Sequence, residues 1–143
     1  MQSYSHEDIS SAWAKIRERY PKPGYSIRVA VYNAAAGVWK GFLDTTPSEV
    51  KDLLQTNVAA AFAFSREAIL EFKENEIQEP FGKRGTLIFT GATASIRGNV
   101  VTSAFSAAKH AQRALSQSLA KEFGKQNIHV AHVSLAYEGI GQN

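Results

Sequence analysis

The sequence contains no cysteine and no long run of apolar residues. Without cysteine the chain can form no disulfide, and it has no thiolate to serve as a nucleophile or a metal ligand. A membrane-spanning helix needs about 20 consecutive apolar residues, and no segment of the sequence approaches that length. The first residues, from Met1 to Asp8, lack the basic and apolar stretches of a secretory signal. These absences favour a soluble, cytoplasmic protein with no membrane partner.

A strong excess of one charge is also missing, because 16 basic and 13 acidic residues give a net charge of +3. The densest basic segment, from Lys15 to Arg28, contains no recognisable nucleic-acid-binding motif, and a solvated helix face explains it better. His129 and His132 lie at odd spacing in a predicted strand and therefore face opposite sides. They do not form a metal-binding pair. We expect neither a nucleic-acid partner nor a metal site.

Helical and strand patterns alternate along the chain. Apolar residues recur at helical spacing over three segments, residues 6–20, 47–73 and 104–124. Short stretches rich in β-branched residues predict strands at 26–32, 85–90 and 127–135. Because helices separate the strands, the strands should be parallel and joined by right-handed crossovers. We therefore expect an α/β fold, a partial, doubly wound Rossmann-like sheet of three strands and three main helices, in a single domain.

Five short segments, in order along nearly the whole chain, resemble the motifs of one enzyme family: residues 31–37, 56–58, 85–98, 105–109 and 127–130. The segment from Phe105 to Lys109 is similar to the Tyr-x-x-x-Lys active-site segment of the short-chain dehydrogenase/reductase family. The segment from Val31 to Gly37 resembles the Asn-Asn-Ala-Gly sequence that follows the fourth strand in that family. Any one of these motifs is weak, but five with family-like spacing identify the resemblance.

The resemblance implies an oxidoreductase that transfers a hydride between a nicotinamide cofactor, NADP or NAD, and a small alcohol or carbonyl substrate. On this alignment Asn57 corresponds to the asparagine that disturbs its helix and supports a proton-relay water. Lys109 corresponds to the lysine that binds the nicotinamide ribose. The segment formed by Asn33, Ala34 and Ala35 would lie beside the cofactor, although Asn33 can equally be read as a plain loop residue.

The sequence departs from the family at the two residues that form hydrogen bonds with the substrate carbonyl. Phe105 occupies the position of the catalytic tyrosine, and a phenyl ring cannot exchange a proton with a carbonyl oxygen. Counting back by the family's usual spacing reaches Ala92 where the catalytic serine should stand. The nearby hydroxyls of Thr93 and Ser95 are candidate replacements, although loop hydroxyls often bond the neighbouring backbone instead. Tyr137, after the last strand, is a further candidate phenol.

Two larger motifs of the family have no counterpart in the sequence. One is the glycine-rich turn, of the Thr-Gly-x-x-x-Gly-x-Gly kind, that holds the cofactor pyrophosphate. The other is the substrate-covering loop near the carboxyl terminus. We therefore expect a truncated NAD(P)-binding domain over residues 1–143, the central portion of the family fold. The strand at 26–32 would then lie at a sheet edge, which favours a homo-oligomer.

Two functional hypotheses remain open. The first is an active oxidoreductase with Asn57, Lys109 and a hydroxyl from Thr93 or Ser95 at its site. The second is a non-catalytic fragment or pseudoenzyme that serves as a packing or dimerisation module. A surface of alanines on the helix at 47–73, at positions 59, 60, 61 and 63, would suit a dimer face, and close packing on the sheet explains these alanines equally well.

Overall fold

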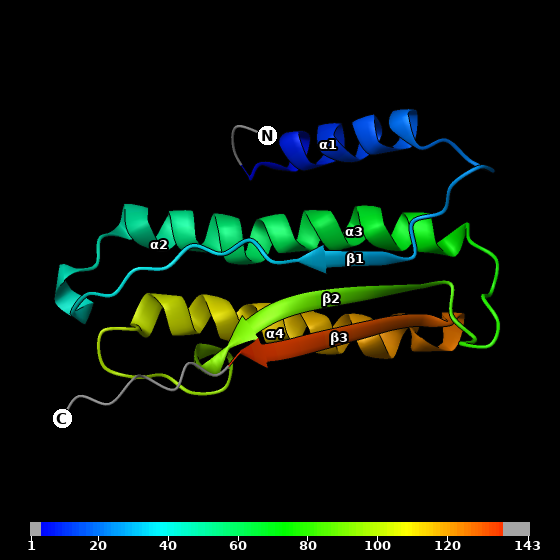
Figure 1. Ribbon diagram of the computed structural model, residues 1–143. Coiled ribbons are helices and arrows are strands. Elements are labelled where there is room, and N and C mark those ends of the chain that lie inside the picture. Colours follow the sequence, from blue (N-terminus) through cyan, green and yellow to red (C-terminus); the bar gives the residue numbers. More distant parts are fainter. Residues whose placement is uncertain (1–3, 136–143) are drawn as a thin grey trace, which may run out of the picture.

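The computed structural model describes residues 4–135 and contains a three-stranded parallel sheet with the strand order β1-β2-β3 (Figure 1). The strands are β1 (Val29–Tyr32), β2 (Gly85–Ala92) and β3 (Ile128–Leu135). The helices are α1 (His6–Arg19), α2 (Pro47–Leu54), α3 (Ala60–Lys73) and α4 (Ser103–Phe123). The predicted α/β fold with parallel strands is confirmed. Among the described residues, no helix is both long and apolar enough to cross a membrane.

The predicted helix at 47–73 is divided in the structure. Its start follows the sequence closely, because Thr46 and Glu49 form a capping box and Pro47 stands in the first turn. Lys40 and the helix terminus bind the Glu49 carboxylate and lower its pKa to about 2. After Leu54, however, the chain forms a π-helical segment, Gln55–Ala59, in which the Ala60 N–H reaches back five residues to the Gln55 carbonyl. Asn57 lies at the centre of this segment.

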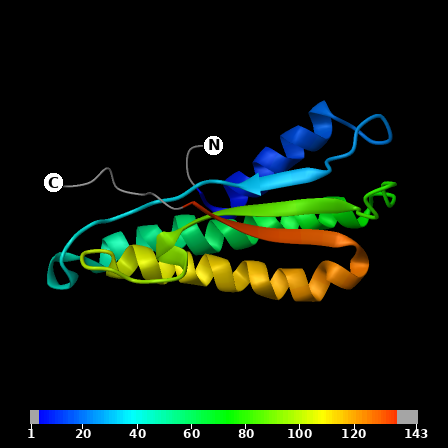
Figure 2. The same ribbon diagram turned by 60° about the horizontal axis from the view of Figure 1, so that its bottom comes forward.

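Helices α3 and α4 cover one face of the sheet, with small residues at the closest contacts (Figures 1 and 2). Ala60, Ala61 and Ala63 of α3 are buried in the core, so of the four alanines only Ala59 is exposed, and close packing accounts for the other three. The ring of Phe72 lies over Gly85, where an added Cβ would come within 2.2 Å of the ring. Glycine and alanine therefore set how closely α3 can approach the sheet.

The opposite face of the sheet carries no helix from the described part of the chain. Val29 and Val31 of β1 and Val133 of β3 point to this side and are exposed. Their alternation with the buried Ala30 and Tyr32 shows that one side of β1 contributes to the core and the other does not. The described residues thus supply one helix layer of the predicted doubly wound arrangement.

Helix α1 packs beside α3, beyond the edge formed by β1 (Figure 1). Ile9 and Trp13 are buried, and Trp13 contacts Phe64 of α3 with 5.5 Å between ring centroids. The apolar stripe of α1, formed by Ile9, Trp13 and Ile16, is therefore covered over its first two residues. Only Ile16 at the end of the stripe is exposed. The aromatic rings of α3 reach across to α1 and cover it.

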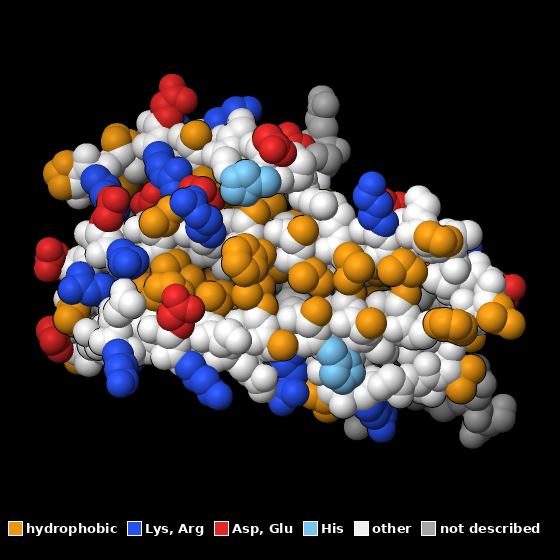
Figure 3. Space-filling view, turned by 180° about the vertical axis from the view of Figure 1, so that it is seen from behind, with side chains coloured by type: hydrophobic (Ala, Val, Ile, Leu, Met, Phe, Trp, Pro, Cys, Tyr) orange, Lys and Arg blue, Asp and Glu red, His pale blue; other side chains and the backbone are white. Residues whose placement is uncertain are grey.

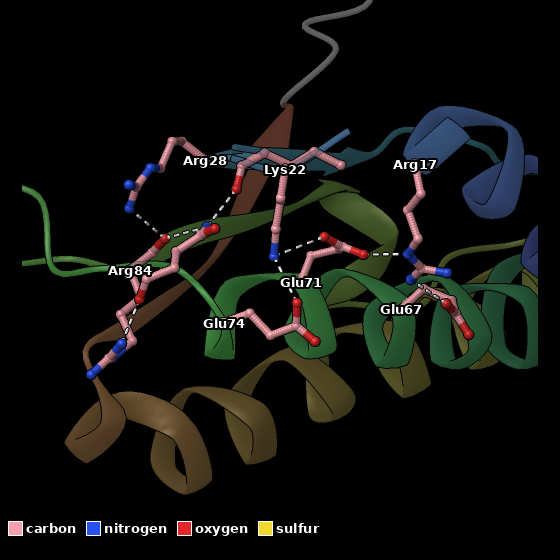
Figure 4. Close-up of polar contacts among 9 residues, drawn as sticks. Arg17, Lys22, Arg28, Glu67, Glu71, Glu74 and Arg84 are labelled. Atoms are coloured by element: carbon pink, nitrogen blue, oxygen red, sulfur yellow. Dashed lines mark hydrogen bonds and ion pairs between the residues drawn. The ribbon is translucent and has the colours of Figure 1, made fainter. Parts of the chain in front are cut away.

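Ion pairs reinforce the contact between α1 and α3 (Figure 4). The Arg17 guanidinium binds the carboxylates of Glu67, at 2.7 Å, and Glu71. Lys22, just after α1, lies 3.4 Å from Glu71 and 2.9 Å from Glu74. The hydrogen bond with Glu71 raises the pKa of Arg17. These pairs orient the amino-terminal helix at the end of the molecule away from the candidate site.

Candidate active site

A cleft of about 360 Å³ opens where β2 and β3 end and α4 begins. Ligands of parallel α/β sheets bind at this edge, outside the carboxyl ends of the strands. The cleft is lined by Trp39, Ala92, Thr93, Ala94, Arg97, Asn99, Thr102, Phe105 and Leu135. Three of the sequence-predicted positions, Ala92, Thr93 and Phe105, therefore meet at one site.

Phe105 forms an apolar wall of the cleft together with Trp39. Their ring centroids lie 5.3 Å apart with the planes tilted by 44°. Phe105 lies in the first turn of α4, and Trp39 comes from the loop that follows β1. The loop that follows β1 also contacts the segment just before α4, because the Lys40 N–H donates a hydrogen bond to the Val101 carbonyl at 3.1 Å. The position that a phenol would occupy in the family is held here by an aromatic ring without a hydroxyl.

The two candidate replacement hydroxyls differ in accessibility. Ser95 is fully buried, and its Oγ accepts a hydrogen bond from the Ala92 N–H at 3.1 Å. It does not line the cleft. Thr93 does, and its hydroxyl forms no hydrogen bond with any residue from 4 to 135. Of the two, only Thr93 can present a free hydroxyl to a ligand.

Ser134 is a hydroxyl that the sequence reasoning missed. It lies near the end of β3, is exposed, and donates a hydrogen bond to the Ala92 carbonyl at 3.2 Å. The parallel register pairs Ser134 with Gly91 and so brings it beside the position of the family serine. The predicted parallel arrangement already places the carboxyl ends of the strands at one edge of the sheet, but the register of β2 and β3 was needed to find this residue. Tyr137 lies outside the described residues.

Lys109 is only 3% exposed and lies one turn after Phe105 on α4. Its Nζ donates to the Thr90 carbonyl at 3.0 Å and to Oε1 of Gln112 at 3.2 Å. No acidic side chain of the described structure forms an ion pair with it, and burial lowers the pKa of the amine. Lys109 does not line the cleft itself, but one of its three N–H donors remains unused.

His132, for which the sequence analysis gave no role beyond excluding a metal pair with His129, lies close enough to Lys109 to be affected by its charge. Its imidazole fills the space over Gly91, where an added Cβ would approach the ring carbon Cε1 to 2.0 Å. Burial, together with the charges of Arg113 and Lys109, lowers the pKa of His132. Its Nε2 and the Nε2 of Gln112 are buried without a hydrogen-bond partner among residues 4–135. Lys109, Gln112 and His132 therefore form a polar cluster beneath the strand ends.

Asn57 joins the helix to the loop that follows β1. Its amide nitrogen donates to the Ala36 carbonyl at 2.8 Å and to the Leu53 carbonyl at 3.0 Å, and the residue is fully buried. The amide oxygen Oδ1 has no partner within the described chain. The π-helical geometry also leaves the Thr56 carbonyl free to accept a hydrogen bond from the Tyr32 hydroxyl. A π-helical turn inside an α-helix is rare and frequent at functional sites.

The segment with Asn33, Ala34 and Ala35 is placed differently from the cleft residues. Asn33 and Ala34 line a separate depression next to Ile9 and Trp13 of α1, while the later part of the same loop reaches the cleft through Trp39. The structure therefore does not bring Asn33 together with Thr93 and Phe105. No cluster of three or more potential metal ligands occurs in the part of the chain that the structure describes.

Comparison with known proteins gives consistent matches. A family model described as short chain dehydrogenase matches residues 1–138. The chain is 32% identical over 113 residues to L-2,3-butanediol dehydrogenase of Corynebacterium glutamicum, covering 79% of this chain and 42% of that protein. It is 29% identical over 130 residues to 3alpha-hydroxysteroid dehydrogenase of Mediterraneibacter gnavus, covering 91% and 49%. The chain thus spans about half the length of these curated relatives.

The fold is also that of solved structures. A gluconate 5-dehydrogenase from Burkholderia cenocepacia, in complex with NADP and tartrate, superposes with a TM-score of 0.79. The similarity covers 94% of this chain and 48% of that one, at 16% sequence identity. At this identity the match establishes the arrangement of strands and helices alone.

The contact between Gly91 and His132 gives a test of the polar cluster. Gly91→Ala should destabilise the protein by about 1–3 kcal/mol, because the imidazole must leave its packed position. In a His132→Ala background the same change should be neutral or stabilising, because the space is then empty. Urea unfolding of the four proteins measures the coupling. Equal costs of Gly91→Ala in both backgrounds would contradict the packing described here.

Proposed function

This chain belongs to the short-chain dehydrogenase family, and we propose that it acts as an oxidoreductase on a small alcohol or carbonyl compound with a nicotinamide cofactor. The observation that carries the proposal is Lys109, a buried amine beside the strand ends with no acidic partner in the described structure. An uncompensated buried cation is costly for folding. A polar ligand bound next to the cleft would accept a hydrogen bond from this lysine and so offset part of that cost.

The residues around the cleft fit the nicotinamide-ribose end of such a cofactor. Lys109 has one free N–H donor for a ribose hydroxyl. Oδ1 of Asn57 and the Nε2 atoms of Gln112 and His132 have no hydrogen-bond partner among residues 4–135, and buried water commonly fills such positions. The chemistry supplied by a bound nicotinamide is hydride transfer to or from carbon. NADP in the gluconate 5-dehydrogenase structure supports this class of cofactor and does not choose between NADP and NAD.

The chain's own side chains would bind and orient the substrate. Thr93 can donate its free hydroxyl to a carbonyl oxygen, and the rings of Trp39 and Phe105 exclude water from one side of the cleft. Phe105 supplies no proton. A proton for the product alcohol must therefore come from solvent or from a hydroxyl such as Thr93 or Ser134. The non-catalytic alternative rests on the same feature, because phenylalanine stands at position 105 where the family has its catalytic tyrosine.

We also propose that two copies of the chain associate through the outer surface of the helix layer. A groove of about 250 Å³ between α3 and α4 is lined mainly by apolar side chains, among them Phe62, Leu70, Leu115 and Leu119. Figure 3 shows this band of hydrophobic side chains across the helix face. Contiguous exposed apolar patches mark association sites, and a two-fold dimer places the same patch against itself.

Cofactor binding by the 143-residue chain should involve the nicotinamide-ribose end alone, because the sequence contains no Thr-Gly-x-x-x-Gly-x-Gly segment. We expect nicotinamide mononucleotide and the full dinucleotides to bind equally, with dissociation constants of about a millimolar, roughly −4 kcal/mol. Trp39 is 63% exposed in the cleft and provides the fluorescence signal. Lys109→Met should weaken both ligands. A micromolar affinity for a dinucleotide that the mononucleotide does not share would contradict this expectation.

Phe105→Tyr should raise the rate of carbonyl reduction at saturating cofactor by about 10² to 10⁴, the usual contribution of a positioned general acid. Phe123→Tyr, at the far end of the same helix, is the matched control and should leave the rate unchanged. Initial rates of cofactor oxidation provide the measurement. Equal rates with phenylalanine and tyrosine at position 105 would show that another group supplies the proton. Absence of turnover in both proteins would favour the non-catalytic alternative.

Sedimentation at low micromolar concentration should show a dimer that Phe62→Glu converts to a monomer. Phe62 is 60% exposed in the described chain, so the substitution places a charge in the groove without disturbing the core. Leu43→Glu is the control, because Leu43 is 94% exposed and lies away from the groove. If the dimer persists in Phe62→Glu and is lost in Val31→Lys, the edge strand or bare sheet face forms the interface instead.

A further inference from the structure

Among residues 4–135, Arg97 is the only charged side chain that lines the cleft at the strand ends. Its guanidinium forms no ion pair and no hydrogen bond with any of the residues from Tyr4 to Leu135. Its backbone N–H, by contrast, is held by the Thr93 carbonyl at 3.1 Å, four residues earlier. The free hydroxyl of Thr93 and the free guanidinium of Arg97 therefore project from the same turn. Two side chains with unused donors therefore line the same cleft.

The loop that carries Arg97 is ordered by other contacts. The Asn99 N–H donates to the Thr102 hydroxyl at 2.9 Å, and that hydroxyl donates back to the Asn99 carbonyl at 2.8 Å. The Asn99 side chain accepts from the Val100 N–H at 2.8 Å. The Thr102 hydroxyl also lies 2.9 Å from that of Ser106 on α4. None of these contacts uses the Arg97 side chain, so the loop keeps its shape without it.

The surroundings of Arg97 favour an anionic ligand. None of the described residues that line the cleft is an aspartate or a glutamate, and Trp39, Phe105 and Leu135 make part of its wall apolar. A guanidinium presents parallel N–H donors that match the two oxygens of a carboxylate. Apolar walls lower the local dielectric constant and so strengthen an ion pair formed between them. A carboxylate in this position would satisfy donors that no group of the described protein satisfies.

We propose that the cleft binds a small oxo acid or hydroxy acid, whose carboxylate is held by Arg97 and whose carbonyl or hydroxyl oxygen is held by Thr93. The inference rests on the proposed oxidoreductase function, because it names the substrate class of the same site. The cleft of about 360 Å³ limits the ligand to a compact molecule. Arg97 determines specificity in this account, and Thr93 contacts the reacting group.

Binding of matched acids and esters tests the proposal without relying on turnover. Pyruvate, acetoacetate and levulinate differ in the separation of carboxylate and carbonyl, and each has a methyl ester of similar shape without the charge. Trp39 fluorescence of the full chain reports binding of all six compounds. We expect at least one acid to bind roughly ten-fold or more tightly than its ester, since hydrogen bonds to charged groups are the stronger ones. Added salt should reduce this difference.

Variants separate the role of Arg97 from a general effect of charge. Arg97→Gln should abolish the preference for the acid, and Arg97→Lys should retain part of it, because lysine keeps the charge and loses the paired donors. Arg19→Gln is the matched control, since Arg19 is an exposed arginine on α1, distant from the cleft. Unfolding midpoints should be unchanged in all three, because Arg97 is exposed and its side chain makes no ion pair or hydrogen bond with the described residues.

The outcomes are distinct. Equal binding of every acid and its ester, or no binding of any acid, overturns the proposal. A preference for the acid that survives Arg97→Gln overturns the assignment to Arg97. Reduction of neutral ketones without any preference for acids would leave the oxidoreductase function standing and overturn the carboxylate site. A preference for acids that depends on Arg97 but is not accompanied by turnover would support the site and count against the proposed function.

Discussion

The amide of Asn57 connects two segments on which the geometry of the cleft depends. Its nitrogen donates to Leu53 within its own helix and to Ala36 in the loop after β1. That loop continues to Trp39, which packs against Phe105, and to Lys40, whose N–H binds Val101. Because the donors are fully buried, replacing them would leave carbonyl groups unsatisfied, at about 1–3 kcal/mol each. One side chain thus fixes the helix and the wall of the site together.

Two glycines, which carry no side chain, allow aromatic rings to pack closely against β2. Gly85 lets Phe72 lie flat on β2, and Gly91 makes room for the ring of His132. The second glycine has a chemical consequence, because it allows an imidazole to approach Lys109 and Gln112 beneath the strand ends. Burial and the neighbouring cations lower the pKa of His132 and so favour its neutral form. His132 therefore adds polar atoms to the cluster with Lys109 and Gln112 without adding a second positive charge.

The sequence predicted all six main elements to within a few residues, because apolar periodicity is a local property that each segment carries by itself. The π-helical turn at Asn57 was beyond that reasoning, since it depends on an acceptor in a distant loop. Ser95 and Thr93 were indistinguishable in sequence, and only the fold shows that Ser95 binds the Ala92 backbone while Thr93 faces the cleft. Ser134 required the register of β2 and β3, which side-chain patterns do not specify.

For the proposed oxidoreductase, phenylalanine at position 105 removes one contribution to catalysis and leaves a larger one in place. A positioned general acid contributes about 10² to 10⁴ in rate, or roughly 3–5 kcal/mol at 1.36 kcal/mol per decade. Holding two reactants in a near-attack geometry can contribute about 7–11 kcal/mol. In the proposed function, Lys109, Thr93 and Arg97 would orient the cofactor and the substrate, and these contacts do not depend on a phenol. The absence of the tyrosine therefore lowers the maximum rate that the site could reach, but it does not by itself make the site non-catalytic.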